Sequence, residues 1–197
     1  MYRNLKRPFD ILCVVITMPL WLPLMVVLAV LVKATSRGNV FFKQKRYGKN
    51  HTFFMIYKFR SMYSDTPKDV PTHLLQNPAS YITPIGRFLR KSSLDELPQL
   101  LNVLKGDISL VGPRPALWNQ DDLIAERDKY GANSVPVGIT GWAQINGRDE
   151  LPIPDKAALD GEYVKRFGFI TDIKILILTV FCALAGKGVK EGGTGNR

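Results

Sequence analysis

The longest apolar stretch of the chain covers residues 11–32 and contains no charged residue. A helix of about 20 apolar residues is long enough to cross the hydrocarbon core of a bilayer. Pro19 and Pro23 lie near its middle, where each removes a backbone donor and lipid offers no replacement. The pattern predicts a membrane segment that breaks at these prolines into two helices, with a straight spanning helix as the alternative.

Basic residues flank this segment on both sides. A spanning helix usually has excess positive charge on one side only, whereas both ends of a re-entrant helix return to the cytoplasmic face. The flanking residues are Arg3, Lys6, Arg7, Lys33, Arg37, Lys43, Lys45, Arg46 and Lys49. We therefore expect residues 1–36 to form a re-entrant membrane helix with basic flanks.

The remaining pattern predicts an α+β fold that is mostly helical. Residues 40–45 and 52–59 are aromatic and β-branched runs around a glycine-containing turn, which indicates a short β-hairpin. Residues 117–130 and 155–167 repeat apolar side chains at helical spacing. Residues 171–185 are more apolar and predict a core or interfacial helix. These elements predict one domain over residues 37–185.

Two further stretches lack such periodicity. Residues 63–81 are polar and contain three prolines, which predicts a long loop, either a mobile flap or an insertion. Residues 186–197 are rich in glycine and predict a disordered tail.

The net charge of the chain predicts an anionic partner. With 27 Lys and Arg against 17 Asp and Glu, the chain carries +10 and would attract nucleic acid, anionic lipid or a phosphorylated substrate. The basic residues concentrate beside the apolar segment and no base-stacking motif is recognised, so a nucleic-acid binder is disfavoured. Cys13 and Cys182 lack metal-ligand spacing, so neither zinc nor a disulfide framework is indicated.

Asp95 and Glu96 are adjacent carboxylates in a basic segment. Residues 93–96 match a capping box, in which both carboxylates would simply begin a helix. Pro98, however, falls where that helix needs a backbone donor. Side chains at adjacent helical positions diverge, so the pair suits divided roles, with one carboxylate attacking phosphorus and the other binding Mg²⁺ against a diphosphate.

Arg114 stands between Pro113 and Pro115. The two prolines restrict the backbone, so the guanidinium is presented rigidly and could clamp phosphoryl oxygens through two parallel hydrogen bonds. The simpler alternative is a turn before the next helix. Glycines within residues 138–147 would let backbone approach a ligand, and Arg148 is a further phosphate candidate.

Six motifs in order resemble those of the monotopic polyprenol-phosphate phosphoglycosyl transferases, the bacterial sugar transferase family, in its small single-domain form. They are residues 6–10 (KRPFD), 42–48 (FKQKRYG), 57–62 (YKFRSM), 94–100 (LDELPQL), 109–115 (SLVGPRP) and 138–144 (GITGWAQ). The resemblance extends over residues 2–184. One departure is that the family's Ser-Pro break in the re-entrant helix is here Met18-Pro19, with a second proline at Pro23.

The resemblance implies an enzyme that moves a sugar-1-phosphate from a UDP-sugar to polyprenol (undecaprenyl) phosphate, as the first membrane step of glycoconjugate assembly. Asp95 would displace UMP and carry the phosphosugar covalently, Glu96 would bind Mg²⁺, and Arg114 would hold the nucleotide or its phosphates. The other implied substrate-binding residues are Lys58, Arg60, Arg87, Arg90, Arg148 and Asp160. Residues 37–185 would be the catalytic domain.

The same resemblance implies a monotopic protein on the cytoplasmic face of the bacterial inner membrane. Its partners would be the UDP-sugar, polyprenol phosphate and membrane lipids but no nucleic acid, and homo-oligomer formation stays open. A rival interpretation is a non-catalytic basic scaffold or lipid-binding module at the membrane surface, in which Asp95 and Glu96 only cap a helix.

Overall fold

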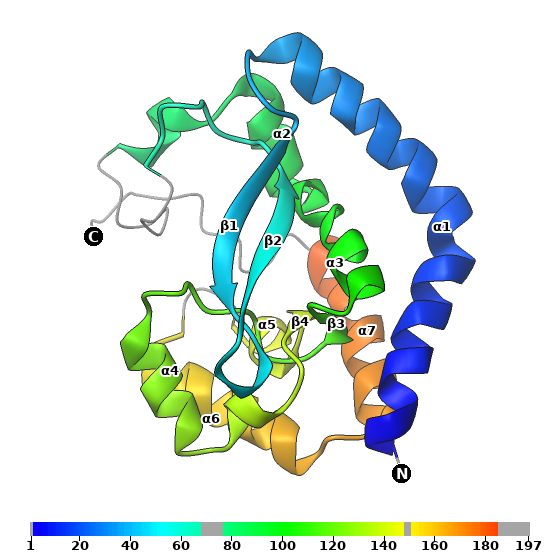
Figure 1. Cartoon of the computed structure of the whole chain (residues 1–197), viewed down its shortest axis with the longest axis vertical. Helices are drawn as coiled ribbons and strands as arrows, with labels where there is room; N and C mark the ends of the chain where they lie inside the picture. Colours follow the sequence, from blue (N-terminus) through cyan, green and yellow to red (C-terminus); the bar gives the residue numbers. More distant parts are fainter. Residues whose placement is uncertain (1, 68–76, 148–150, 185–197) are drawn as a thin grey trace.

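The computed structural model describes residues 2–67, 77–147 and 151–184 (Figure 1). Its larger elements are α1 (Tyr2–Thr35), β1 (Phe41–Tyr47), β2 (Phe53–Phe59), α2 (Pro84–Lys91), α3 (Gln99–Lys105), β3 (Ser109–Val111), α4 (Asp121–Asp128), β4 (Gly138–Thr140), α5 (Trp142–Ile145), α6 (Ile153–Lys165) and α7 (Phe169–Leu184). Short 3₁₀ turns are η1 (Lys49–His51), η3 (Pro78–Tyr81), η4 (Leu94–Glu96) and η5 (Ala132–Ser134). The described chain is mostly helical, as predicted. Arg148 and the predicted tail lie outside the described residues.

The predicted break in the membrane segment is not found, because α1 continues through Pro19 and Pro23. The helix instead changes direction gradually along its length (Figure 1). Each proline removes only its own backbone donor, so the backbone hydrogen bonds on either side of it can continue the helix. Side chains in this part of the helix also bond to its carbonyls, with Trp21 Nε1 donating to Val14 at 3.0 Å and Thr17 Oγ1 donating to Cys13 at 2.7 Å. The helix therefore bends without ending.

One face of α1 is buried along almost its whole length. The buried residues follow helical spacing and are Lys6, Asp10, Val14, Trp21, Met25, Leu28 and Val32. They pack on α2, α3 and β3, and their apolar members share one core with residues such as Phe59 and Val103. The opposite face exposes apolar side chains, with Ile16 67% and Leu20 77% exposed. Within the described chain, α1 is the helix long and apolar enough to cross a membrane.

The predicted hairpin is confirmed. Strands β1 and β2 pair antiparallel in a register that joins Phe41 to Phe59 and Tyr47 to Phe53. Lys58, opposite Phe42, lies one residue before the end of β2. The pairing therefore fixes the position of Lys58. A second sheet, which the sequence pattern did not predict, consists of the parallel strands β3 and β4.

The predicted C-terminal helices are also confirmed as α4, α6 and α7. Helices α4 and α6 pack together around an ion pair in which Arg127 Nη2 lies 2.6 Å from Asp160 Oδ2, with both side chains almost fully buried. In α7, Ile175 is fully buried whereas Ile170 is 83% exposed. The helix thus has one face in the core and an apolar face that is exposed, as an interfacial helix would.

Breaking half of the buried Arg127–Asp160 pair should destabilise the fold. Arg127→Met removes two donors to Asp160 Oδ2, at 2.8 Å from Nε and 2.6 Å from Nη2, and leaves a desolvated carboxylate. We expect the free energy of unfolding to fall by about 3–5 kcal/mol. Because an apolar pair has no charge to desolvate, Arg127→Met combined with Asp160→Leu should recover most of this loss. Urea unfolding in detergent would measure both, and equal stability of Arg127→Met and wild type would contradict the prediction.

Candidate active site

Asp95 and Glu96 lie in η4, the turn between α2 and α3. The turn begins at Ser93, whose backbone is left-handed (φ 57°) and whose side chain caps no backbone donor. The backbone changes direction here, and α3 starts after Pro98 without a side-chain cap. The capping-box interpretation of residues 93–96 is therefore wrong, because both Ser93 and Glu96 lack the reciprocal bonds that define it.

The Glu96 carboxylate joins three separate parts of the chain. Lys58 Nζ, from β2, donates to Oε1 at 2.7 Å. Arg114, from the loop after β3, donates from Nη2 to Oε1 at 2.6 Å and from Nη1 to Oε2 at 3.4 Å. Burial alone would raise the pKa of Glu96, but Arg114 and Lys58 together hold it well below its ordinary value. Glu96 is thus a fixed anion that gathers two cations.

The neighbouring Asp95 has a different environment. The residue is 8% exposed, and its Oδ2 lies 3.9 Å from Lys58 Nζ, an ion-pair distance that is too long for a hydrogen bond. Burial raises the pKa of Asp95, the charge of Glu96 raises it further, and Lys58, Arg90 and Arg114 oppose these effects. A carboxylate that is more basic than usual and not bonded to its nearest lysine has lone pairs available for a substrate.

The backbone that carries Arg114 is held by the parallel strand pair. Gly112 N donates to Thr140 O at 2.8 Å, and Gly138 N donates to Pro113 O at 2.9 Å. A Cβ atom on Gly138 would lie 2.1 Å from Gly112 N, so only glycine permits this approach. Gly138, one of the glycines within residues 138–147 that we expected to let backbone approach a ligand, thus packs against Gly112 and helps to position Arg114.

Two of the other predicted site residues lie on α2. Arg90 is half-buried, and its charge acts on the pKa of Asp95. Arg87 is exposed on the same helix. Helix α2, which carries both arginines, packs on η4 as well as on α1.

The side chains of two predicted site residues make their contacts away from the two carboxylates. The Arg60 side chain is buried, and its Nη2 donates to both the carbonyl and the hydroxyl of Ser36 at 2.7 Å, just after α1. Asp160 pairs with Arg127 between α4 and α6. The structure thus brings together Asp95, Glu96, Lys58 and Arg114, with Arg90 close by.

The two carboxylates could supply one or two ligands to Mg²⁺, but they could not complete its coordination shell. Among residues 2–67, 77–147 and 151–184, no group of three or more His, Cys, Asp or Glu side chains could hold a metal. Mg²⁺ usually takes only one or two protein carboxylates and completes its shell with water and substrate phosphates. Glu96 Oε2 has the longer Arg114 contact, at 3.4 Å, and so retains acceptor capacity for a metal.

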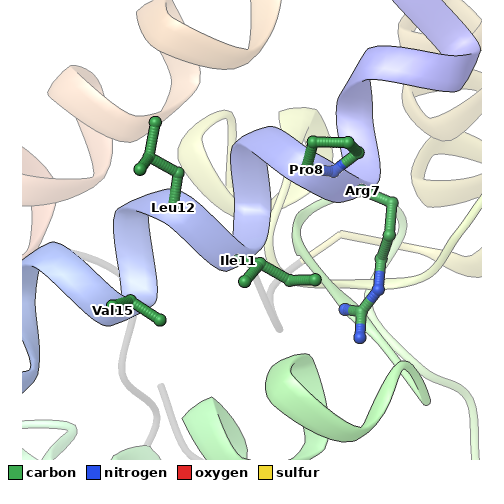
Figure 2. Close-up of a pocket in the computed structure, with 5 residues that line it drawn as sticks. All are labelled: Arg7, Pro8, Ile11, Leu12 and Val15. Atoms are coloured by element: carbon green, nitrogen blue, oxygen red, sulfur yellow. The ribbon is translucent and has the colours of Figure 1, made fainter.

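A surface pocket of about 440 Å³ lies away from these carboxylates, along α1. It is lined by Arg7, Pro8, Ile11, Leu12 and Val15, and Figure 2 shows Ile11 and Leu12 extending from different sides of the helix. None of these residues belongs to η4, β2 or the Arg114 loop. Because the lining is apolar apart from Arg7, it does not suit an anionic nucleotide, and we place the candidate site at Asp95 instead.

Sequence reasoning missed a buried polar cluster at the start of α1. Lys6 Nζ lies 2.5 Å from Asp172 Oδ2 in α7, and both side chains are almost fully buried. Asp10 accepts a hydrogen bond from Ser109 Oγ at 2.7 Å. Helical spacing could have indicated this cluster, because Asp10 and Lys6 lie one and two turns before Val14 on the buried face of α1.

Comparison with known proteins gives one consistent family. The family model described as bacterial sugar transferase matches residues 1–186. The "Uncharacterized sugar transferase EpsL" of Bacillus subtilis is 42% identical over 95% of this chain and 91% of EpsL.

Larger relatives carry names that state a reaction. The "Undecaprenyl-phosphate glucose phosphotransferase" of Komagataeibacter xylinus is 42% identical over 89% of this chain, which spans 35% of that protein. The "UDP-glucose:undecaprenyl-phosphate glucose-1-phosphate transferase" of Escherichia coli is 39% identical over 94% of this chain, which spans 41% of that protein. From the family match over nearly its whole length, the chain belongs to the bacterial sugar transferase family.

Proposed function

We propose that this protein is a phosphoglycosyl transferase that moves a sugar-1-phosphate from a UDP-sugar to polyprenol phosphate and releases UMP. The observation that carries the proposal is the pairing of a buried, weakly engaged Asp95 with a Glu96 that holds Lys58 and Arg114. The printed names of the Komagataeibacter and Escherichia relatives support it. In the scaffold alternative the two carboxylates would only cap a helix, and the absence of a side-chain cap bond at Ser93 and at Pro98 gives that alternative no support.

The donor would bind through its diphosphate. The Arg114 side chain is 38% exposed although it contacts the much less exposed Glu96, so a substrate can approach it from the solvent side. Lys58 and Arg114 can share their donors between Glu96 and phosphoryl oxygens, because each carries several N–H groups. The two cations would thereby place the diphosphate beside Asp95.

Transfer would then proceed in two displacements at one phosphorus atom. A carboxylate oxygen of Asp95 bonds to the β-phosphorus of the UDP-sugar, and the bond from that phosphorus to the bridging oxygen breaks, so that UMP leaves with the electron pair. A phosphate oxygen of polyprenol phosphate next attacks the same phosphorus. The acyl-phosphate bond breaks, Asp95 regains its charge, and polyprenyl-diphosphate-sugar is released.

We also propose that the reaction depends on Mg²⁺, held by Glu96 together with phosphate oxygens of the donor. The ion would supply neutralisation of the diphosphate charge that otherwise repels an anionic nucleophile. Lys58 and Arg114 would supply part of the same neutralisation from the protein, and Glu96 would keep both of them oriented.

The attachment of α1 supports a monotopic arrangement on the cytoplasmic face of the inner membrane. At its start, Tyr2 and Lys6 both donate to Asp172 of α7 at 2.5 Å. Directly after its end, Ser36 is bound by Arg60 at 2.7 Å. A single domain that holds both ends of a helix leaves both ends on one side of the bilayer. The basic flanks favour the cytoplasmic side.

Asp95→Asn should abolish transfer while the protein still folds and binds membranes. Asparagine keeps the shape of the side chain but lacks the anionic oxygen, so UMP release should fall by roughly a thousandfold or more. The wild-type protein, given a UDP-sugar without acceptor, should gain the mass of one phosphosugar in intact-protein mass spectrometry. The panel would contain UDP-hexoses and UDP-N-acetylhexosamines, and Asp121→Asn, which changes an exposed carboxylate on α4, serves as the control.

If wild type never gains this mass with any donor, and two-substrate kinetics give intersecting rather than parallel lines, the covalent mechanism is wrong. Direct transfer in a ternary complex would then replace it.

UMP release should stop in excess EDTA and return when Mg²⁺ is added. Glu96→Gln should lower kcat/KM by about 100-fold or more, because it removes the charge that binds the metal and orients Lys58 and Arg114. Circular dichroism would establish that the variant is folded. Undiminished activity in EDTA would rule out the metal role, whatever Glu96→Gln does.

Both ends of α1 should be accessible from the cytoplasm. On a background in which Cys13 and Cys182 are replaced, single cysteines at Arg3 and Arg37 should resist an impermeant thiol reagent added to intact cells. Both should react after the cells are opened. Labelling of the Arg3 position alone in intact cells would show a spanning helix instead.

A further inference from the structure

The first turns of α1 make polar contacts with two elements that are distant in the sequence. The Arg7 guanidinium donates to the carbonyls of Val103 and Leu104, the latter at 2.9 Å, near the C-terminal end of α3. The Asp10 carboxylate accepts from Ser109 Oγ at 2.7 Å, at the start of β3. These contacts fix α3 and β3 to the same end of the membrane helix.

Helix α3 is attached directly to the carboxylate turn. It begins at Gln99, following Pro98 and the turn that contains Asp95 and Glu96. The last carbonyls of a helix lack intrahelical partners, and an arginine that binds them satisfies these acceptors and complements the helix dipole. Arg7 therefore binds the C-terminal end of α3, whose N-terminal end follows the turn that carries both carboxylates.

Strand β3 leads in the other direction, to Arg114. Its end is bound to α1 through Tyr163, whose hydroxyl lies 2.8 Å from Asp172 Oδ1 and 3.3 Å from Val111 O. Asp172 in turn pairs with Lys6. The chain then passes through Gly112 and Pro113, both hydrogen-bonded to the β4 segment, before it reaches Arg114. Both ends of this short strand are thus connected to α1.

We infer that the first turns of α1 are a positioning element of the active site, with Arg7 and Asp10 as positioning residues. Neither side chain is bonded to Asp95, Glu96 or Arg114. Each instead fixes one of the two parts that meet in the 2.6 Å contact between Glu96 and Arg114. A relative shift of about 1 Å would break that contact, because hydrogen bonds weaken steeply beyond about 3.2 Å. The inference rests on the proposed function only for its effect on nucleotide binding.

The experiment changes the two ends of one hydrogen bond, through Asp10→Asn and Ser109→Ala, in the full chain in lipid nanodiscs. Hydrogen exchange of peptides covering residues 93–101 and 109–117 should become about tenfold faster or more in both variants, the factor expected when a buried bond to a charged group is lost. This readout requires no activity, so it tests the positioning role even if the proposed reaction is wrong.

Binding of UDP separates positioning from simple loss of stability. The apparent dissociation constant of UDP is the intrinsic constant divided by the folded fraction, so where each variant is more than about 95% folded a merely structural role would leave it nearly unchanged. Displacement of Arg114 should raise it about tenfold. A wild-type protein that does not bind UDP would count against the proposed function, while hydrogen exchange would still decide the positioning role.

A matched pair of variants controls for charge near the membrane. Arg7→Met and Arg3→Met each remove one positive charge from the start of α1, but Arg3 is exposed. Arg7→Met should speed exchange in residues 93–105 and weaken UDP binding, whereas Arg3→Met should behave as wild type. The inference is overturned if exchange in both peptides is unchanged in Asp10→Asn, Ser109→Ala and Arg7→Met, or if Arg3→Met has the same effect as Arg7→Met.

Discussion

A carboxylate removed from water needs partners of opposite charge, and the architecture of the site follows from how Glu96 finds them. Lys58 lies in a strand and Glu96 lies in a tight turn. Arg114 lies in a loop, where a proline stands on each side of it. Because these segments are far apart in the sequence, the pairing holds only if the hairpin, η4 and the β3–β4 pair keep fixed relative positions. The close backbone approach at Gly112 and Gly138 is one structural cost of that requirement.

Helix α1 has one face buried in the protein and one exposed face along its length, and its sequence differs between the two. Its outer face exposes large apolar residues such as Leu20, whereas its inner face begins with the charged Lys6 and Asp10 and continues with apolar side chains. A helix that only anchored the protein would not need buried charges at its first turns. Their partners in α7 and β3 make the helix part of the fold.

The sequence predicted elements whose signals are local. The hairpin and helices α4, α6 and α7 follow from alternation, turn residues and helical periodicity, and the grouping of Asp95, Glu96, Lys58 and Arg114 agrees with the motifs. It did not predict the β3–β4 pair, because three-residue strands paired across a long connection leave little periodic signal. The side chains of Arg60 and Asp160 also bind away from the carboxylates, since partners such as Ser36 and Arg127 are chosen by tertiary packing. The proline rule failed in α1, which continues through Pro19 and Pro23, because each proline removes only its own backbone donor.

The adjacent carboxylates show how one turn can give two identical groups different properties. Burial raises the pKa of Asp95, whereas Arg114 and Lys58 outweigh the same effect at Glu96 and lower its pKa. A pair whose pKa values are separated in this way can divide its tasks, with the more basic member free to form a bond and the other held as a permanent anion. The separation arises because η4 directs Glu96 toward both cations and leaves Asp95 3.9 Å from Lys58. The irregular turn at Ser93 is therefore the local feature on which the proposed division of roles would depend.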